Sequence, residues 1–360
     1  MIELTSARLD SFVKAAFGGN ARLVDYGDLA SLDKQGMKRF GYGKPLLLRY
    51  EVDGEPHEGV LSVMRGDKYG HQFYWDRASV LMFQFETSAA MPRHVRPLGL
   101  GYVDAAGNLV PLRGPREFFI LNEKLEGYDY YHDLERIRGG GMVPLDVENV
   151  RALARWLAEV HSVKKDDPDL YFRRVRDLVG SSECIMGLVD EAFPHPYSEY
   201  PDERFQALER GVLDWRWKLK GYAHRLAAVH GDLHPWNVLV DGRGGFSVLD
   251  RSRGEWGEPA GDLATLAINY LLFGLYDKPR LQGDFERLYR VWFEEYLERT
   301  SDDEALEVIA PFFVFRALVI ASPEWYPSHP PEVRRGLFRF MENVLREERF
   351  DWERINRYME

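Results

Sequence analysis

The sequence has little cysteine: Cys184 is its single one among 360 residues. No disulfide can form within such a chain, and this usage is typical of proteins in a reducing cytosol. The residues before position 20 lack the charged start and apolar run of a signal peptide. The most apolar late stretch, 308–321, is broken by Pro311 and Arg316, which predicts a buried helix rather than a membrane span. We therefore expect a cytoplasmic protein that does not enter a membrane.

The sequence also lacks an excess of positive charge. Its formal net charge is −11, which argues against binding to the phosphate backbone of a nucleic acid. It contains no internal repeat, no low-complexity tract and no G-x-x-x-x-G-K-[ST] motif, so it is not a P-loop protein. Its hydrophobic content of 45% is that of an ordinary globular protein, and its length suits two sizeable cores.

The first third of the chain has the pattern of β-strands. Runs 45–54 and 57–66 are rich in strand-forming residues, and the turn sequence that starts at Asp53 and Gly54 joins them as a hairpin. Residues 75–91 have apolar positions at helical spacing. Two further strand-like runs follow at 96–112 and 116–127.

From about residue 128 the pattern is helical. Residues 147–163 predict an amphipathic helix, and most of the chain after Pro201 has the same period. One exception, 237–250, predicts two short strands around a glycine-rich turn. The order indicates an α+β fold with a β-rich N-terminal lobe over residues 1–122, a hinge at 123–127 and a mainly helical C-terminal lobe over 128–360.

The stretch before that hairpin, H-G-D-L-H-P-W-N, has an unusual density of polar side chains. His230, Asp232 and His234 alternate, as the metal ligands of a metallohydrolase could in an extended segment. A polar turn without chemistry explains each residue singly but not their joint spacing. No second cluster of metal-ligand residues of similar density occurs elsewhere in the sequence.

A phosphoryl-transfer site accounts for more of the stretch. This chemistry needs a carboxylate near the attacking hydroxyl and oxygen ligands for Mg²⁺. Asp232 would be the catalytic carboxylate, and Asn237, five positions later, would supply one metal ligand. The hairpin would return the chain to place Asp250, the principal metal ligand, beside the loop.

The run H-G-D-L-H-P-W-N followed by L-D-R-S-R-G resembles the aminoglycoside phosphotransferase and choline kinase superfamily. The resemblance implies a two-lobe protein-kinase-like fold and an Mg²⁺-dependent kinase with ATP as the donor and GTP as the alternative. It implies that Asp262, in G-E-P-A-G-D, opens a helix and braces the loop. His230 is expected to support the loop, and His234 to support it or to pack.

The same resemblance suggests a nucleotide site in the N-terminal lobe. Gly41 and Gly43 could let the backbone cover the phosphates. Glu123 and Leu125 fit the segment whose backbone contacts the adenine. The usual strand lysine is missing, and Arg65 is the candidate replacement, with Lys68 behind it; the alternative is that Arg65 is a solvated residue at a strand end.

Four further side chains belong to this prediction. Asp76 or Glu86 is the candidate for the acid that orients the phosphate-binding cation. Arg251 directly follows the metal aspartate, where the family more often has an apolar or aromatic residue, and Arg253 stands two positions later. They are expected either to bind phosphate or to form a structural pair with Glu255 or Glu258.

The expected acceptor is a hydroxyl of a small molecule, such as an amino-sugar, sugar, choline-like amine or amino-alcohol. Asp262 follows Asp250 by only twelve positions, which leaves no platform for a peptide substrate. Glu324, Trp325 and Tyr326 could contact the acceptor, or the two aromatic rings could be packing residues. The competing function is a catalytically silent nucleotide-binding or scaffold protein, and the sequence does not indicate an oligomeric state.

Overall fold

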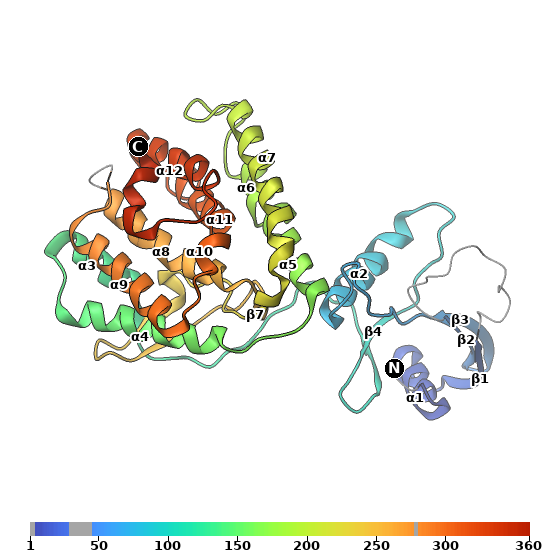
Figure 1. Cartoon of the computed structure of the whole chain (residues 1–360). Coiled ribbons are helices and arrows are strands. Elements are labelled where there is room, and N and C mark those ends of the chain that lie inside the picture. The colour runs from blue at the N-terminus through green and yellow to red at the C-terminus, as the bar shows by residue number, and fades with distance from the viewer. Residues whose placement is uncertain (1–3, 29–44, 277–279) are drawn as a thin grey trace. The chain divides into compact units, whose positions relative to one another are not determined.

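The computed structural model describes residues 4–28, 45–276 and 280–360. The chain divides into two compact units, residues 1–122 and residues 123–360. The described residues of the first unit form two antiparallel sheets and two α-helices, and the second unit is mainly helical (Figure 1). The predicted α+β class is confirmed.

The first unit is built on a three-stranded antiparallel sheet in the order β1-β2-β3, which α1 covers. Leu9 and Val13 of α1 pack with Leu48 and Tyr50 of β2 in a buried cluster. The elements of this unit are α1 (Ser6–Phe17), β1 (Arg22–Asp28), β2 (Leu46–Val52), β3 (Glu55–Leu61), α2 (Tyr74–Thr87), the 3-10 turn η2 (Ser88–Ala90), β4 (Leu100–Val103) and β5 (Leu109–Leu112).

The hairpin predicted around Asp53 and Gly54 is confirmed. β2 and β3 pair from Val52↔Glu55 onward. Asp53 and Gly54 have positive φ angles of 52° and 86°, the conformation that a two-residue hairpin turn requires. Residues 96–112 contain the antiparallel pair β4 and β5. β3 ends at Leu61, so the predicted strand through Gly66 is too long.

The strand predicted at 116–127 is wrong. No strand is present from 113 to 127, although Phe119, Ile120 and Leu121 have the apolar character that predicted one. A strand needs a neighbouring chain to complete its hydrogen-bond ladder, and no described strand pairs with this segment. These three side chains are 94%, 82% and 92% exposed.

The second unit packs its helices around α8, whose seventeen residues are almost all buried. Its helices are α3 (Tyr131–Gly140), α4 (Pro144–His161), α5 (Pro168–Gly180), α6 (Ile185–Glu191), α7 (Asp202–Leu219), α8 (Pro259–Leu275), α9 (Gly283–Thr300), α10 (Ala305–Val308), α11 (Ala310–Ala321) and α12 (Pro331–Val344), with the 3-10 segments η3 (Lys220–Arg225), η4 (Pro235–Asn237) and η5 (Trp352–Met359). Its short strands are β6 (Tyr128–Asp129), β7 (Ala227–Ala228), β8 (Val238–Val240), β9 (Phe246–Val248) and β10 (Trp256–Gly257).

The predicted helix over 147–163 lies within α4, and the stretch broken by Pro311 and Arg316 forms the buried helix α11. Pro311 is tolerated because it stands in the first turn, where its missing N–H has no helical partner. Of the helices in the described ranges, none is both long enough and apolar enough to span a bilayer.

The second predicted hairpin is also confirmed. β8 pairs with β9 through Val238↔Val248 and Val240↔Phe246, and β6 pairs with the other edge of β8. Leu249 N donates to Asn237 O at 2.9 Å, which extends the ladder by one step beyond the strands. The hairpin therefore sets the residue after Leu249 beside the end of the polar loop.

Candidate active site

The polar loop from His230 to Asn237 connects β7 to the hairpin. Gly231 has a φ of 91°, and a Cβ at this position would lie 3.2 Å from the Cβ of Arg253. Both the backbone angle and the close neighbour favour glycine. The next residue, Asp232, is 7% exposed, and Asn237 is 8% exposed. The loop thus carries its acidic and amide side chains into the second unit.

Asp262, in the first turn of α8, holds the loop through its backbone. Its Oδ2 accepts a hydrogen bond from His230 N at 2.7 Å, and its Oδ1 accepts one from Gly231 N at 2.8 Å. His161 Nε2 donates to Oδ2 at 3.2 Å, and His161 Nδ1 lies 2.8 Å from the hydroxyl of Tyr296. Burial opposes ionisation of Asp262, but the bonds from His161 and His230 outweigh it and lower its pKa.

Two arginines hold the carboxylate of Asp232. Arg316 Nη1 donates to Oδ1 at 2.7 Å, and Arg253 Nε donates to Oδ2 at 3.2 Å. Burial alone would raise the pKa of Asp232, but the positive charges of Arg316 and Arg253 lower it below its ordinary value. Asp232 is therefore an ionised carboxylate at neutral pH.

Asn237 and Asp250 lie next to each other at the open end of the hairpin. Asn237 Nδ2 donates to the backbone oxygen of Asp232 at 3.0 Å, so its side-chain oxygen is the atom that a metal ion could take. Asp250 is exposed and has a φ of 52°, an uncommon angle for a residue with a side chain. His230 and Asp250 line one cavity of about 350 Å³.

The ligand set of the metallohydrolase hypothesis does not converge. Among the described residues, no three or more His, Cys, Asp or Glu side chains are arranged to hold a metal ion. Asp232 is occupied by the arginines, and His230 Nδ1 accepts from Asp232 N at 3.3 Å. His234 Nε2 is 3.9 Å from Asp232 Oδ2. Burial lowers the pKa of His234, which therefore stays neutral near pH 7.

The predicted structural pairing with Glu255 is made by Arg251, but through the backbone oxygen of Glu255 and not through its carboxylate. Arg251 donates to the backbone oxygens of Val229 and Glu255. Arg253 bonds Asp232 and Glu183. Glu258 is instead bound by Arg225, which comes from a distant part of the chain and is itself buried.

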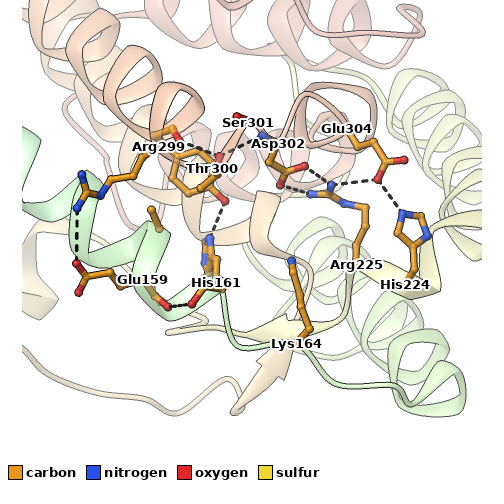
Figure 2. Close-up of a pocket in the computed structure, with 13 residues that line it drawn as sticks. Glu159, His161, Lys164, His224, Arg225, Arg299, Thr300, Ser301, Asp302 and Glu304 are labelled. Carbon is orange, nitrogen blue, oxygen red and sulfur yellow. Dashed lines mark hydrogen bonds and ion pairs between the residues drawn. The ribbon is translucent and has the colours of Figure 1, made fainter.

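A second cavity, of about 540 Å³, lies where α4, η3 and α9 end (Figure 2). Most of its charged groups pair with one another: Arg225 with Asp302, and His224 with Glu304. His161 lines this cavity too and reaches Asp262 through Nε2. One residue of the cavity wall, His161, therefore also contacts Asp262, the residue that holds the polar loop.

The residues predicted to bind nucleotide are divided between the two units, and each is described within its own unit. Gly41 and Gly43 lie outside the described residues. Arg65 is exposed, four positions beyond the end of β3. Asp76 Oδ2 accepts from Phe73 N at 2.9 Å in the first turn of α2. The two predicted adenine contacts both lie in the irregular segment before β6; Glu123 is exposed and Leu125 is half-buried. Their roles stay predictions.

The predicted acceptor residues lie between α11 and α12. Glu324 and Trp325 are exposed, and the ring of Tyr326 stacks on His329 at 5.1 Å between centroids. Arg334, buried in α12, binds the backbone oxygens of Ala321, Tyr326 and His329. Among the described residues, no contact joins Glu324, Trp325 or Tyr326 to Asp232. The segment that holds them follows α11, and Arg316 of that helix contacts Asp232.

Sequence reasoning missed the role of Arg316. It stands within an apolar run, where we noted it only as an interruption. A charged residue in a buried helix needs a partner, and this was the signal that could have singled it out. His161 is a second residue that supports the loop from a distance in the sequence, through its bond to Asp262.

A family model described as phosphotransferase enzyme family matches residues 95–300, more than half of the chain. Solved structures similar to the chain include a Plasmodium vivax ethanolamine kinase (13% identity, 94% of this chain and 80% of that one, TM-score 0.34). An amicoumacin kinase has 13% identity over 92% of this chain and 91% of that one, with a TM-score of 0.39. A choline kinase from Streptococcus pneumoniae has 13% identity over 97% and 96%, with a TM-score of 0.31. With TM-scores below 0.5, these similarities say nothing about the activity of this chain. No curated protein matches the sequence.

Proposed function

Because the chain belongs to the phosphotransferase enzyme family, we propose that it transfers the γ-phosphoryl group of ATP to a hydroxyl of a small molecule. The observation that carries the proposal is the arrangement of Asp232, Asn237 and Asp250. Asp232 is buried, the Asn237 amide is bonded to the main chain of Asp232, and the hairpin returns the backbone to Asn237 directly before Asp250. These are the groups that phosphoryl transfer requires.

Asp232 is proposed to bind the acceptor hydroxyl. Its carboxylate is ionised, because two arginines lower its pKa. A carboxylate of this kind accepts a hydrogen bond from the hydroxyl and turns a lone pair of that oxygen toward the phosphorus. The hydroxyl proton then passes to Asp232 as the new P–O bond forms and the bond to the nucleoside diphosphate breaks. Orientation contributes more than basicity, because the transition state of this reaction is loose.

Asn237 and Asp250 are proposed to hold Mg²⁺. Their donor atoms are an amide oxygen and a carboxylate oxygen, the hard ligands that Mg²⁺ takes beside water and phosphate. When bound, the ion would neutralise charge on the nucleotide phosphates. The bond from Asn237 Nδ2 to Asp232 O fixes which end of the amide faces outward.

The acceptor is proposed to be a small molecule of the amino-sugar, sugar, choline-like or amino-alcohol class. The segment from Ser322 to His329 is short and is held by Arg334, so it fits the wall of a small site rather than a surface for a peptide. Trp325 is 49% exposed, which leaves a ring face for an acceptor.

The test is release of nucleoside diphosphate from Mg·ATP across a panel of these four acceptor classes, with phosphorylated product identified by mass. Asp232→Asn should lower acceptor-dependent release by at least 100-fold and leave nucleotide affinity within about twofold. Asp250→Ala should also remove the Mg²⁺ dependence of nucleotide binding.

The matched control is Asp241→Asn, because Asp241 is an exposed hairpin aspartate only nine positions before Asp250. It should keep full turnover. Nucleotide binding without any phosphorylated product would favour the silent scaffold, and Mg²⁺-dependent binding that survives in Asp250→Ala would contradict the metal assignment.

A further inference from the structure

Arg316 binds the polar loop from a helix that is distant in the sequence. It belongs to α11, lies 84 positions from Asp232 in the sequence and has a side chain only 9% exposed. Its Nη1 donates to Asp232 Oδ1 at 2.7 Å, and its Nη2 donates to the backbone oxygen of Gly231 at 3.1 Å. One guanidinium therefore holds both the carboxylate and the main chain of the preceding residue.

The two oxygens of Asp232 are held differently. Oδ1 faces the buried Arg316. Oδ2 faces Arg253, whose side chain is 25% exposed, and His234, whose side chain is 29% exposed. The contact to Oδ1 is 2.7 Å and that to Oδ2 is 3.2 Å. Oδ2 is thus the oxygen on the accessible side, with the weaker partner.

Phe315 packs against both arginines. The guanidinium of Arg316 lies 4.4 Å from the centre of its ring, and that of Arg253 lies 5.5 Å from it. The ring is 5% exposed. A planar guanidinium beside a buried ring has few other orientations, so Arg316 is a rigid support and not a mobile surface charge.

We propose that Arg316 is a positioning residue for phosphoryl transfer: it fixes Asp232 with Oδ1 turned to the interior and Oδ2 presented to the acceptor hydroxyl. The inference rests on the proposed function. Two different nitrogens of the planar guanidinium bind the Asp232 carboxylate and the Gly231 oxygen. A lysine has one nitrogen and could not make both bonds with this geometry. The same helix ends at Ala321, where the proposed acceptor segment begins.

The experiment compares Arg316→Lys and Arg316→Gln with the wild type in the full chain. A misplacement of the carboxylate by about 1 Å is expected to cost roughly 100-fold in kcat. We expect a loss of that size in Arg316→Gln and a loss of at least tenfold in Arg316→Lys. The KM for ATP should stay within about twofold in both, because Arg316 makes no contact with the candidate metal ligands.

A matched control uses another arginine that binds a buried aspartate. Arg136 of α3 donates to Asp146 of α4, which is 1% exposed, and neither residue belongs to the polar loop or to α11. Arg136→Lys should keep the wild-type kcat. The double variant Asp232→Asn with Arg316→Gln removes both charges of the pair. It therefore avoids the loss of stability that one unpaired buried charge would cause. Its residual rate should equal that of Asp232→Asn alone, because Arg316 acts through Asp232.

The outcomes separate the inference from the proposed function. Absence of transfer by the wild type to every acceptor refutes both. Transfer by the wild type with an unchanged kcat in Arg316→Lys or Arg316→Gln refutes only the positioning role. A further fall in rate when Arg316→Gln is added to Asp232→Asn also refutes it, because a general structural effect would add to the first loss.

Discussion

The bond from Asp262 to the loop leads to a quantitative prediction for Asp262→Asn. The substitution keeps the shape of the side chain but removes its charge and turns one oxygen into an NH₂ donor. In the wild type both oxygens face donors: His230 N and His161 Nε2 at Oδ2, and Gly231 N at Oδ1. Whichever way the amide turns, one N–H donor of the loop or of His161 then faces another donor.

The magnitude follows from these contacts. A hydrogen bond to a charged group is worth about 1.5–3 kcal/mol, and an unsatisfied buried N–H costs about 1–3 kcal/mol. We expect Asp262→Asn to lower the free energy of unfolding by about 3 kcal/mol, a large part of the stability of an ordinary domain. We also expect kcat to fall by roughly 100-fold, because the loop that carries Asp232 loses its anchor.

The assay is urea unfolding followed by tryptophan fluorescence, together with acceptor-dependent turnover. Asp241→Asn is again the matched control, since Asp241 Oδ1 accepts from Arg243 N at 2.7 Å and from Gly245 N at 2.9 Å on the exposed hairpin turn. Water can replace those bonds, so this variant should unfold like the wild type. Equal effects of the two substitutions would refute the reasoning, because burial would then make no difference.

Two other predictions follow from the second unit. Burial and the nearby Arg334 lower the pKa of His329 to about 4, so between pH 6.5 and pH 4 the unfolded chain takes up a proton that the folded chain does not. The free energy of unfolding, measured by urea titration, should fall by roughly 3 kcal/mol over that range in the wild type and by clearly less in His329→Gln. An equal dependence of this free energy on pH in the two proteins would contradict the prediction. Gly231→Ala should destabilise the chain by about 1–3 kcal/mol and reduce kcat, because its φ is 91° and Arg253 is close. Gly242→Ala, at a φ of 71° and with only ordinary van der Waals contact to Tyr128 at 3.7 Å, should show the backbone strain without the loss of kcat.

Local features of the fold were predictable from the sequence. The hairpin over 237–250 is set by two short apolar runs and the turn residues between them, all within one stretch of chain. Its register then places Asp250 after Leu249, beside Asn237. The turn at Asp53 and Gly54 is local in the same way. Such elements depend on neighbours in sequence, which a pattern can report.

Features that need a distant partner were not predictable. Residues 116–127 have the apolar character of a strand, but no pattern within a segment says whether another strand will pair with it. The contact of Arg316 with Asp232 joins α11 to a loop 84 positions away. Arg225 and Glu258 are 33 positions apart and also meet in the core. Packing of the helices decides these pairs.

Arg334 holds the segment between α11 and α12 in a way that affects which amino-acid substitutions the segment can accept. Its guanidinium binds only main-chain oxygens, those of Ala321, Tyr326 and His329. Every amino acid carries such an oxygen, so the anchorage does not depend on which side chains occupy positions 323–328. Mutations there could alter ligand preference while the path of the backbone is preserved. The bonds from Arg334 therefore separate the side chains that are proposed to meet the acceptor from the contacts that fix the path of the segment.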